Sequence, residues 1–348
     1  MTGVQTCALP ISIALSDLST SSTLLVSQLN NWSVITVTGP DATDFLQNQL
    51  TNSVKSIKPT NPGEIALAHT QHRFAGYCSA KGRLMSSFWI TRQTIKNELG
   101  EEVPQYQLLI SSDLAQTLSK RLSMFVLRSK VKVIDQTNHY KVYGCLDLGG
   151  SKSALFEKIS AAGIVVAELP AVQVDGGNYQ RYILTSTADH EALIKDISSN
   201  NQETTQAWNW LEVQSGIPRV TQSTFEQFVP QMINMESLKG IDFQKGCYPG
   251  QEVVARSQYR GTIKRRLQIG HINTDADVVI GTEIFHSDDP SQPCGMIVLS
   301  APHPTINQRI DIQAECKLEA PEKGTVHLGS ANGPAIQFAA LPYPLIEI

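Results

Sequence analysis

The pattern of apolar residues changes abruptly near Lys264. Before this point, alternating segments such as residues 33–38 and 181–186 predict half-buried strands, and the periodic segment 205–214 predicts a helix. After it, short alternating segments are separated by Gly, Pro, Asn and Asp, and no helix pattern remains. We therefore expect an α+β region of mixed or antiparallel sheets with helices, followed by a C-terminal all-β barrel.

The chain of 348 residues is too long for one simple core, so two or three domains are expected. We predict an α+β region over residues 21–262, in which residues 135–145 are the candidate boundary between two subdomains. The barrel domain is predicted over residues 263–348. Residues 1–20 show no periodic pattern of apolar residues that would give a helix or strand a buried face. We interpret them as an unstructured tail or scar.

Two local patterns in the α+β region predict particular turns. Lys81-Gly82 stands between two apolar, aromatic-bearing runs and predicts a β-hairpin. Asp41 follows the strand at residues 33–38 and is a good N-cap for the helix expected next.

The overall composition excludes several classes of protein. A net charge of −4 gives the whole molecule no general attraction for nucleic acid, and no apolar run approaches the ~18 residues of a membrane span. The six cysteines contain no C-x-x-C pair, which fits neither a zinc ribbon nor a disulfide framework and favours the reducing cytoplasm. The histidines show no metal-ligand spacing, so no intrinsic metal site is expected.

Residues 245–252 (KGCYPGQE, "the octad") place one thiol, Cys247, among glycines and cations. A thiol is a nucleophile or metal ligand only as thiolate, and nearby cations or a helix N-terminus lower its pKa. Pro249 is expected to open a helix that ends at Gly261. The setting favours a reactive or ligating Cys247 over a buried structural cysteine; Lys245 would lower its pKa, and Gln251 and Glu252 would orient the turn or bind a partner.

Five of the 28 basic residues fall in residues 256–266, which predicts a local anion-binding face with Arg256 and Arg260 as candidates. The alternative is a solvated strand and helix end.

The octad and several other segments resemble the YgfZ family, bacterial folate-binding relatives of the glycine cleavage T-protein, an aminomethyltransferase. The matching segments follow the family order at residues 38–52, 81–83, 126–131, 216–218, 228–234 and 245–261. The resemblance implies a T-protein-like fold, in agreement with the change of pattern near Lys264. It also implies tetrahydrofolate or a derivative as cofactor.

Trp32 and Trp208 match tryptophans implicated in folate binding in the family, although a tryptophan is often only a core residue. Either the basic residues of the Lys81 hairpin or those of residues 256–266 would meet the carboxylates of the folate tail. We further expect an ionised Cys247 that is exposed at the mouth of this pterin-sized cleft.

Aminomethyl transfer in the T-protein requires a carboxylate in the hairpin that corresponds to residues 81–88. Here no Asp or Glu occurs between Ile65 and Asn97, and a serine hydroxyl stays protonated near neutral pH. We therefore expect the ordinary transfer reaction to be lost and the folate cavity to persist, unless a distant carboxylate folds into place.

The family is linked to maturation of iron–sulfur enzymes, including the radical enzyme that methylthiolates certain tRNAs. This favours a cytoplasmic, folate-binding accessory protein whose partners are such iron–sulfur client enzymes, and which is not itself an enzyme. The main alternative is a folate-dependent one-carbon transferase of altered specificity. A direct tRNA binder is disfavoured by the acidic net charge.

Overall fold

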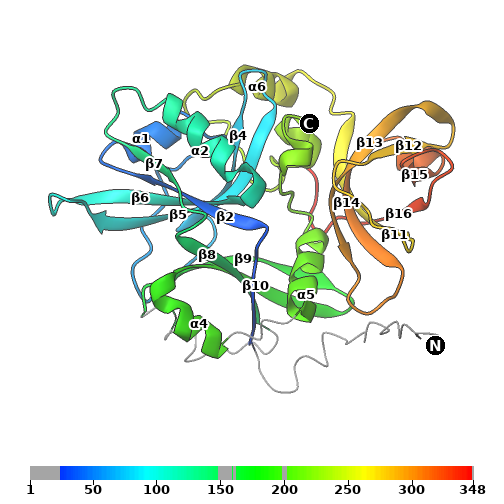
Figure 1. Ribbon diagram of the computed structural model, residues 1–348. Helices are drawn as coiled ribbons and strands as arrows, with labels where there is room; N and C mark the ends of the chain where they lie inside the picture. Colours follow the sequence, from blue (N-terminus) through cyan, green and yellow to red (C-terminus); the bar gives the residue numbers. More distant parts are fainter. Residues whose placement is uncertain (1–23, 148–158, 160–161, 198–201, 347–348) are drawn as a thin grey trace, which may run out of the picture.

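The computed structural model describes residues 24–147, 159, 162–197 and 202–346 (Figure 1). The tail predicted for residues 1–20 lies outside the described residues.

One antiparallel sheet forms the upper left of the molecule in Figure 1. Its strands stand in the order β4-β5-β6-β2-β7. They comprise β2 (Trp32–Thr38), β4 (His72–Cys78), β5 (Leu84–Lys96), β6 (Glu102–Ser111) and β7 (Lys132–Asp135). The hairpin predicted around Lys81-Gly82 is confirmed as β4–β5, with Thr91 paired to His72 near its open end.

A second sheet has the order β1-β8-β10-β9-β3 and lies below the first in Figure 1. Its strands are β1 (Leu24–Gln28), β3 (Ile65–Ala66), β8 (Tyr140–Asp147), β9 (Val165–Val174) and β10 (Gly177–Thr187). All pairs are antiparallel except β3 with β9, so the sheet is mixed.

Helices connect and flank the sheets. They are α1 (Ala42–Gln47), α2 (Ala115–Met124), α4 (Glu191–Ile197), α5 (Gln202–Gln214), α6 (Gln251–Tyr259) and α7 (Ala320–Lys323). Short 3-10 turns cover η2 (Ser112–Leu114), η3 (Ala188–His190), η4 (Gln222–Thr224) and η5 (Pro230–Ile233). Asp41 precedes α1, but its carboxylate makes no cap bond and instead accepts the backbone N–H of Lys130 at 2.8 Å.

The C-terminal strands close into a barrel in the order β11-β14-β13-β12-β15-β16. Their bounds are β11 (Arg265–Asn273), β12 (Glu283–His286), β13 (Asp289–Pro302), β14 (Arg309–Lys317), β15 (Val326–Leu328) and β16 (Ala335–Ala339). The barrel is filled by fully buried side chains such as Ile272, Ile284 and Ile312. The predicted α+β fold with a C-terminal barrel is confirmed; the one-turn helix α7 between β14 and β15 was not predicted.

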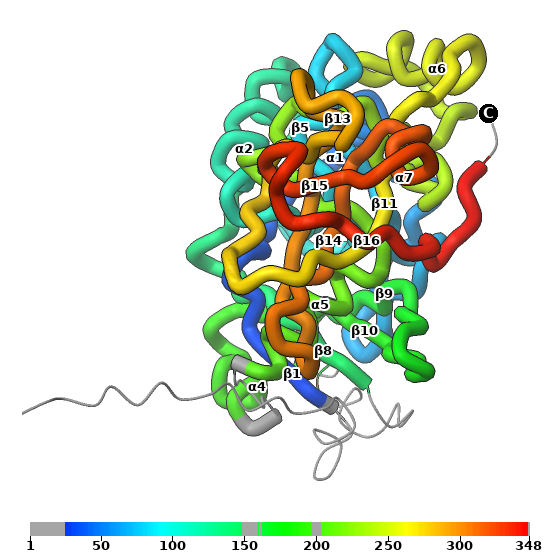
Figure 2. Tube along the Cα trace, turned by 90° about the vertical axis from the view of Figure 1, so that its right-hand side faces the viewer, coloured from blue at the N-terminus to red at the C-terminus, as the bar shows by residue number. Residues whose placement is uncertain are grey.

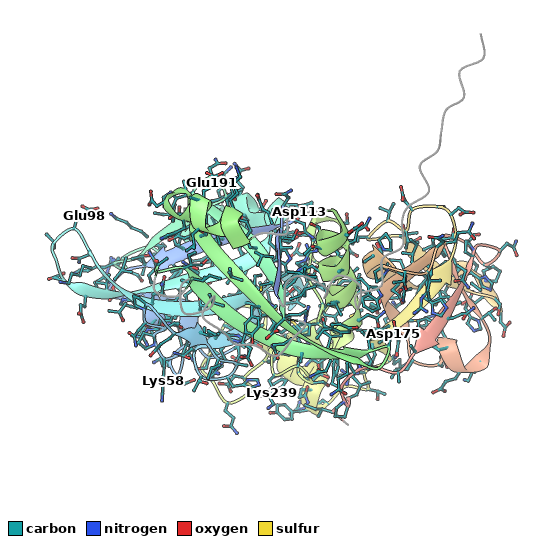
Figure 3. The ribbon with its side chains drawn as sticks, turned by 90° about the horizontal axis from the view of Figure 1, so that it is seen from below. Lys58, Glu98, Asp113, Asp175, Glu191 and Lys239 are labelled. Carbon is teal, nitrogen blue, oxygen red and sulfur yellow. The ribbon has the colours of Figure 1, made fainter. Side chains whose placement is uncertain are left out.

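The barrel is tied to the rest of the chain at several points. The C-terminal segment leaves β16 and runs back to the main body (Figure 2), where the Tyr343 hydroxyl donates to the carbonyl of Gly216 at 2.7 Å. On another side, the tip of the β9–β10 hairpin at Asp175 reaches the barrel (Figure 3), with 3.6 Å between its Oδ2 and Nε2 of His303.

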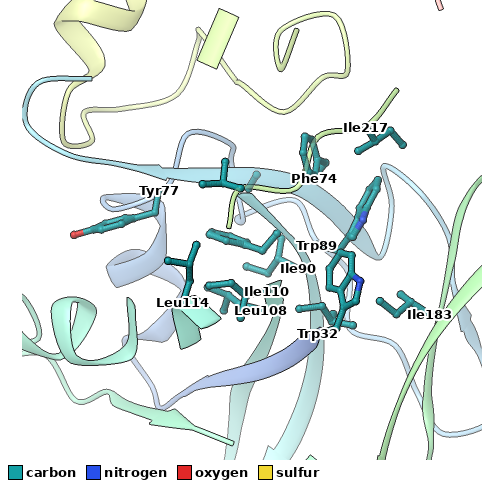
Figure 4. Close-up of a cluster of buried hydrophobic side chains, with 14 of the residues drawn as sticks. Trp32, Phe74, Tyr77, Trp89, Ile90, Leu108, Ile110, Leu114, Ile183 and Ile217 are labelled. Carbon is teal, nitrogen blue, oxygen red and sulfur yellow. The ribbon is translucent and has the colours of Figure 1, made fainter. Parts of the chain in front are cut away.

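A single hydrophobic cluster continues through both sheets, α5 and the near side of the barrel. It contains Val34 and Leu108 of the first sheet, Ile183 of the second, Trp208 of α5 and Leu267 of β11. Figure 4 shows part of this cluster, in which Trp32, Trp89 and Phe74 face the same region. The candidate folate residues are therefore embedded where the sheets and α5 meet.

Candidate functional site

The octad forms a tight turn that leads into α6. The helix begins at Gln251, so the prediction that Pro249 is its first residue is wrong by two positions. Gly250 precedes the helix with φ +77°, a left-handed conformation that glycine adopts without steric cost. A Cβ at Gly250 would lie 2.4 Å from the carbonyl oxygen of Ser79 and 2.6 Å from the backbone of Gly82. Only glycine fits this contact.

Two of the family-like segments therefore pack against each other, because the turn of the β4–β5 hairpin rests on the start of α6. Gly82 has φ +70°, and a Cβ there would lie 2.7 Å from Cβ of Val253. The close approach of two glycine backbones fixes the octad relative to the first sheet.

Lys245 is buried and its side chain turns inward. Its Nζ donates to the backbone carbonyls of Gln47 at 2.6 Å and Leu50 at 2.7 Å, and lies 4.6 Å from the ring centre of Tyr248. Burial lowers the pKa of Lys245 to about 8, while Asp242 and Cys247 act in the opposite direction. The ammonium group thus clamps the octad onto the segment after α1, in addition to standing near the thiol.

Cys247 is exposed, whereas the other described cysteines are buried: Cys78, Cys145, Cys294 and Cys316. Burial raises the pKa of the Cys78 and Cys145 thiols far above the usual range. Among the described cysteines, Cys247 is therefore the one that solvent and partner molecules reach.

The other predicted residues of the octad differ in exposure. Gln251 is half-buried and its Nε2 lies 3.4 Å from the carbonyl oxygen of Lys245, so it braces the turn. Glu252 is exposed in the first turn of α6. Arg256 and Arg260 are exposed at the other end of the same helix.

The basic run at residues 256–266 does not form one continuous face. Arg266 is buried and pairs with buried Glu236, and Arg265 pairs with Glu315 at 2.8 Å. The two paired arginines anchor β11 and are not available to an anion, which leaves Arg256, Arg260 and Lys264 exposed.

Trp32 and Trp208 line one buried cavity of about 20 Å³ ("the inner cavity"). Their indole Nε1 atoms have no hydrogen-bond partner among the described residues. Phe88 and Trp89 of β5 add further aromatic wall. The sequence analysis placed Trp208 on the helix that is α5, whereas Trp32 lies one residue before the predicted strand and is the first residue of β2. The fold brings this strand and this helix to the same cavity.

Charged side chains that the sequence analysis did not identify also line the inner cavity. Arg219 binds Glu212 through Nε and Oε1 at 2.7 Å, donates to Ser111 Oγ at 2.9 Å, and lies 5.1 Å over the Trp32 ring. Arg181 lies 5.7 Å over the Trp208 ring. A weak signal in the sequence indicates that Glu212 and Arg219 lie near the tryptophans. Glu212 follows Trp208 by one helical turn, and Arg219 follows the family-like segment at residues 216–218.

The inner cavity carries two buried cations and one carboxylate. Burial lowers the pKa of Arg181 to about 10, partly opposed by Glu212, so this arginine stays charged at neutral pH. Nε of Arg181 has no partner among the described residues. The cavity is therefore electropositive and suits a ligand with carbonyl or other acceptor groups.

The acid-free interval between Ile65 and Asn97 does not leave the inner cavity without a carboxylate. Glu212 reaches it from α5, but both of its oxygens bind Arg219, at 2.7 and 3.3 Å. Ser87 also lines the cavity, where its hydroxyl donates to the Pro218 carbonyl and accepts the Val220 N–H, each at 3.0 Å. Neither group is free to accept a proton from a substrate.

A second cleft of about 160 Å³ adjoins the inner cavity ("the outer cleft"). The two share Phe74, Trp89 and Ile217, which form the partition between them. The outer cleft is further lined by His69, His72, Arg73 and Lys239.

The groups present suit a pterin, with aromatic walls and unpartnered donors, but the space does not. The inner cavity holds about one water molecule, whereas small-molecule sites span roughly 300–1,000 Å³. A pterin would require Phe74 and Ile217 to move and join the two spaces. Cys247 lines neither of them, so the expectation that it stands at the mouth of this cleft is not met.

A larger cleft, of about 580 Å³, lies between the tip of the β5–β6 hairpin and residues 129–132. It is formed where Gly39 meets Lys130, since a Cβ at Gly39 would lie 2.1 Å from the Lys130 carbonyl oxygen. No aromatic side chain lines it, so it offers no surface on which a pterin could stack.

In the part of the chain that is described, no three His, Cys, Asp or Glu side chains are grouped so that they could hold a metal ion. Within the same residues, no helix is both long and apolar enough to cross a membrane.

Comparison with known proteins gives relatives along most of the chain. The chain is 28% identical over 278 residues to the tRNA-modifying protein YgfZ of Edwardsiella ictaluri (strain 93-146), covering 74% of this chain and 76% of that protein. It is 29% identical over 255 residues to the tRNA-modifying protein YgfZ of Yersinia pseudotuberculosis serotype O:1b (strain IP 31758), covering 70% of each. No protein-family model matches the chain.

Among solved structures, the glycine cleavage system aminomethyltransferase T from Bartonella henselae superposes with a TM-score of 0.59 at 13% identity, covering 94% of this chain and 88% of that one. The predicted resemblance to the YgfZ family and the predicted T-protein-like fold are both confirmed.

Proposed function

We propose that this protein is a tetrahydrofolate-binding accessory protein in tRNA modification, which supports iron–sulfur enzymes through Cys247. The relatives named as tRNA-modifying proteins support the process. One observation carries the folate part of the proposal: Trp32 and Trp208, far apart in sequence, line one buried cavity with unpartnered indole N–H groups.

Tetrahydrofolate would carry one-carbon units when bound. The rings of Trp32 and Trp208 would form the walls for the pterin, and their N–H groups, with Nε of Arg181, would donate to its carbonyl and ring nitrogens. Arg219 and Glu212 would hold Trp32 and α5 in place through their buried ion pair. Binding would begin with the opening of the partition formed by Phe74 and Ile217.

Cys247 would act outside this cavity, on a partner protein. One thiolate cannot hold an iron–sulfur cluster, which usually takes four cysteine ligands. An exposed Cys247 could supply one ligand during transfer to a client. Alternatively, its thiolate could attack a disulfide of the client, which breaks that S–S bond, releases one client sulfur as thiolate and leaves a transient mixed disulfide. Gln251 and Glu252 would orient the turn or contact the client, and Arg256 and Arg260 would contact its acidic groups.

Folate binding is tested by titrating the intrinsic tryptophan fluorescence with tetrahydrofolate. We expect a saturable change that is strongly reduced in Trp32→Phe and Trp208→Phe. Trp210→Phe is the matched control, because its indole donates to Asp311 on the barrel side of α5. A change that persists in both cavity variants, or that disappears only in the control, would contradict the proposal.

The role of Cys247 is tested in a strain lacking the protein, by measuring methylthiolated tRNA after complementation. The wild-type chain should restore the modification, and Cys247→Ala at equal protein abundance should not. Full restoration by Cys247→Ala would count decisively against a reactive or ligating thiol.

A folate-dependent one-carbon transferase with Cys247 as its nucleophile is the second candidate, and the exposure of this thiol is the observation that favours it. An enzyme would convert a one-carbon derivative of tetrahydrofolate in repeated cycles, whereas an accessory protein would bind it unchanged. Chromatography of the folate after incubation with purified protein separates the two.

A further inference from the structure

The outer cleft has a chemical character that the inner cavity lacks. Its polar lining is cationic or neutral: Arg73, Lys239, His69, His72 and Ser237, with no acidic residue among the residues that form it. Burial, Lys239 and Arg73 together lower the pKa of His69, in that order of size, which reflects how close the two cations stand to this imidazole. Such a cleft attracts an anion.

His72 adds a fixed hydrogen-bond acceptor. Its side chain is 1% exposed, and its Nε2 lies 2.6 Å from the carbonyl oxygen of Glu168. A carbonyl only accepts, so Nε2 carries the proton and Nδ1 is left as an acceptor. This Nδ1 has no partner among the described residues, although the ring lines the cleft.

Arg73 keeps donors free for a ligand. Its Nη1 binds the His69 carbonyl and its Nη2 binds Ser56 Oγ at 2.7 Å, which uses two of the five N–H groups of the guanidinium. These contacts hold the head group beside the cleft.

Lys239 is held in place by Asn52, which belongs to one of the family-like segments. The amide Nδ2 of Asn52 donates to the carbonyls of Phe74 at 2.8 Å and Lys239 at 2.7 Å. It therefore joins β4, which carries Arg73, to the turn that carries Lys239. The two cations thus line one cleft from two segments that a buried amide joins.

We propose that the outer cleft binds the glutamyl tail of the folate, with its carboxylates on Arg73 and Lys239 and an amide N–H of the tail on Nδ1 of His72. This inference rests on the proposed folate function and specifies it: the protein prefers folates with several γ-linked glutamates. It also replaces both positions considered from the sequence, since Lys81, Arg83, Arg256 and Arg260 line neither the inner cavity nor the outer cleft.

The experiment compares tetrahydrofolate carrying one and three glutamates by calorimetric titration of the purified full chain. We expect the triglutamate to bind about tenfold more tightly to the wild type. In the double variant Arg73→Gln/Lys239→Gln, the ratio of the triglutamate affinity to the monoglutamate affinity should fall to near one. In Lys239→Gln alone, which changes only an exposed side chain, this ratio should fall part of the way. Lys58→Gln is the control, an exposed lysine on the same side of the molecule that does not line the cleft (Figure 3).

The outcomes separate this inference from the function on which it rests. Equal binding of both ligands by the wild type, or an unchanged ratio in the double variant, overturns the tail site and leaves folate binding intact. A similar loss in Lys58→Gln also overturns it, because the preference would then reflect overall charge. Failure of the wild type to bind either ligand overturns the proposed folate function and the tail site together.

Discussion

His72 links the chemistry of the outer cleft to the stability of the fold. Burial lowers the pKa of this imidazole to about 4, partly opposed by its bond to the Glu168 carbonyl, whereas in an unfolded chain it is about 6.5. Between these values the unfolded state binds a proton that the folded state does not. The free energy of unfolding should therefore fall as the pH drops from 6.5 to 4, by up to about 1.4 kcal/mol per pH unit.

Urea unfolding at pH 7, 6 and 5 measures this slope. His72→Gln retains an N–H donor for the Glu168 carbonyl but does not titrate, so its slope should be shallower than that of the wild type. Identical slopes in the two proteins would contradict a buried neutral histidine at this position.

Cys247 should be the fast-reacting thiol of the folded protein. It is exposed, while Cys78, Cys145, Cys294 and Cys316 are buried. In a Cys7→Ser background, a maleimide should add once quickly to the native protein, as measured by intact mass. Cys247→Ser should abolish this fast addition and change the free energy of unfolding by less than about 0.5 kcal/mol, as expected for an exposed side chain. Fast labelling that survives the substitution would show that another thiol is accessible.

At the scale of the elements, the contact between the β4–β5 turn and α6 decides where Cys247 stands. Gly250→Ala should destabilise the protein by at least about 1–3 kcal/mol, because alanine is strained at φ +77° and its Cβ would strike the backbone of Ser79 and Gly82. The same change should alter the rate of maleimide addition to Cys247, since the turn must shift.

Gly246→Ala is the matched control for Gly250→Ala. Gly246 lies next to Cys247, but a Cβ added at Gly246 would meet no atom within 4 Å. The backbone of Gly246 also lies outside the left-handed region. Its free energy of unfolding should stay within about 0.5 kcal/mol of the wild type. Equal destabilisation by the two alanines would mean that the octad does not depend on the close glycine contact.

The elements themselves were largely predictable because their patterns are local. The alternation of apolar and polar residues predicted β2 and β10, and the Lys81-Gly82 turn predicted the β4–β5 hairpin. The role of the predicted capping residue was not predictable, because the carboxylate of Asp41 accepts the backbone N–H of Lys130 from a distant segment. Such bonds depend on tertiary contacts that a local pattern does not contain.

The candidate site, too, was predictable only where the signal in the sequence is local. Cys247, Trp32 and Trp208 could be identified from a family resemblance, but their separation could not, because it depends on how α6 and α5 pack. The outer cleft was missed entirely. Arg73 and Lys239 lie in segments far apart in sequence, and buried tertiary hydrogen bonds such as those of Asn52 bring them together.

At the scale of the whole molecule, the barrel stabilises the inner cavity without lining it. Gln313 of β14 is fully buried, and its Nε2 donates to the carbonyls of Glu212 at 3.1 Å, Val213 at 2.9 Å and Ile217 at 3.3 Å. These carbonyls end α5 and lead into the segment that forms the partition. One barrel side chain therefore satisfies acceptors that the end of a helix leaves open.

Gln313→Ala should consequently weaken folate binding although Gln313 does not itself line the inner cavity. Loss of the amide removes the donor to the Ile217 carbonyl and one of the donors to the Glu212 and Val213 carbonyls, which costs about 1–3 kcal/mol of stability. It also loosens the end of α5 that carries Glu212. We expect a several-fold weaker affinity for tetrahydrofolate at a temperature at which the variant is still fully folded. Asn307→Ala removes an exposed amide from the barrel surface and should change neither quantity. A destabilised Gln313→Ala that binds tetrahydrofolate as tightly as the wild type would mean that the barrel and the cavity are mechanically independent.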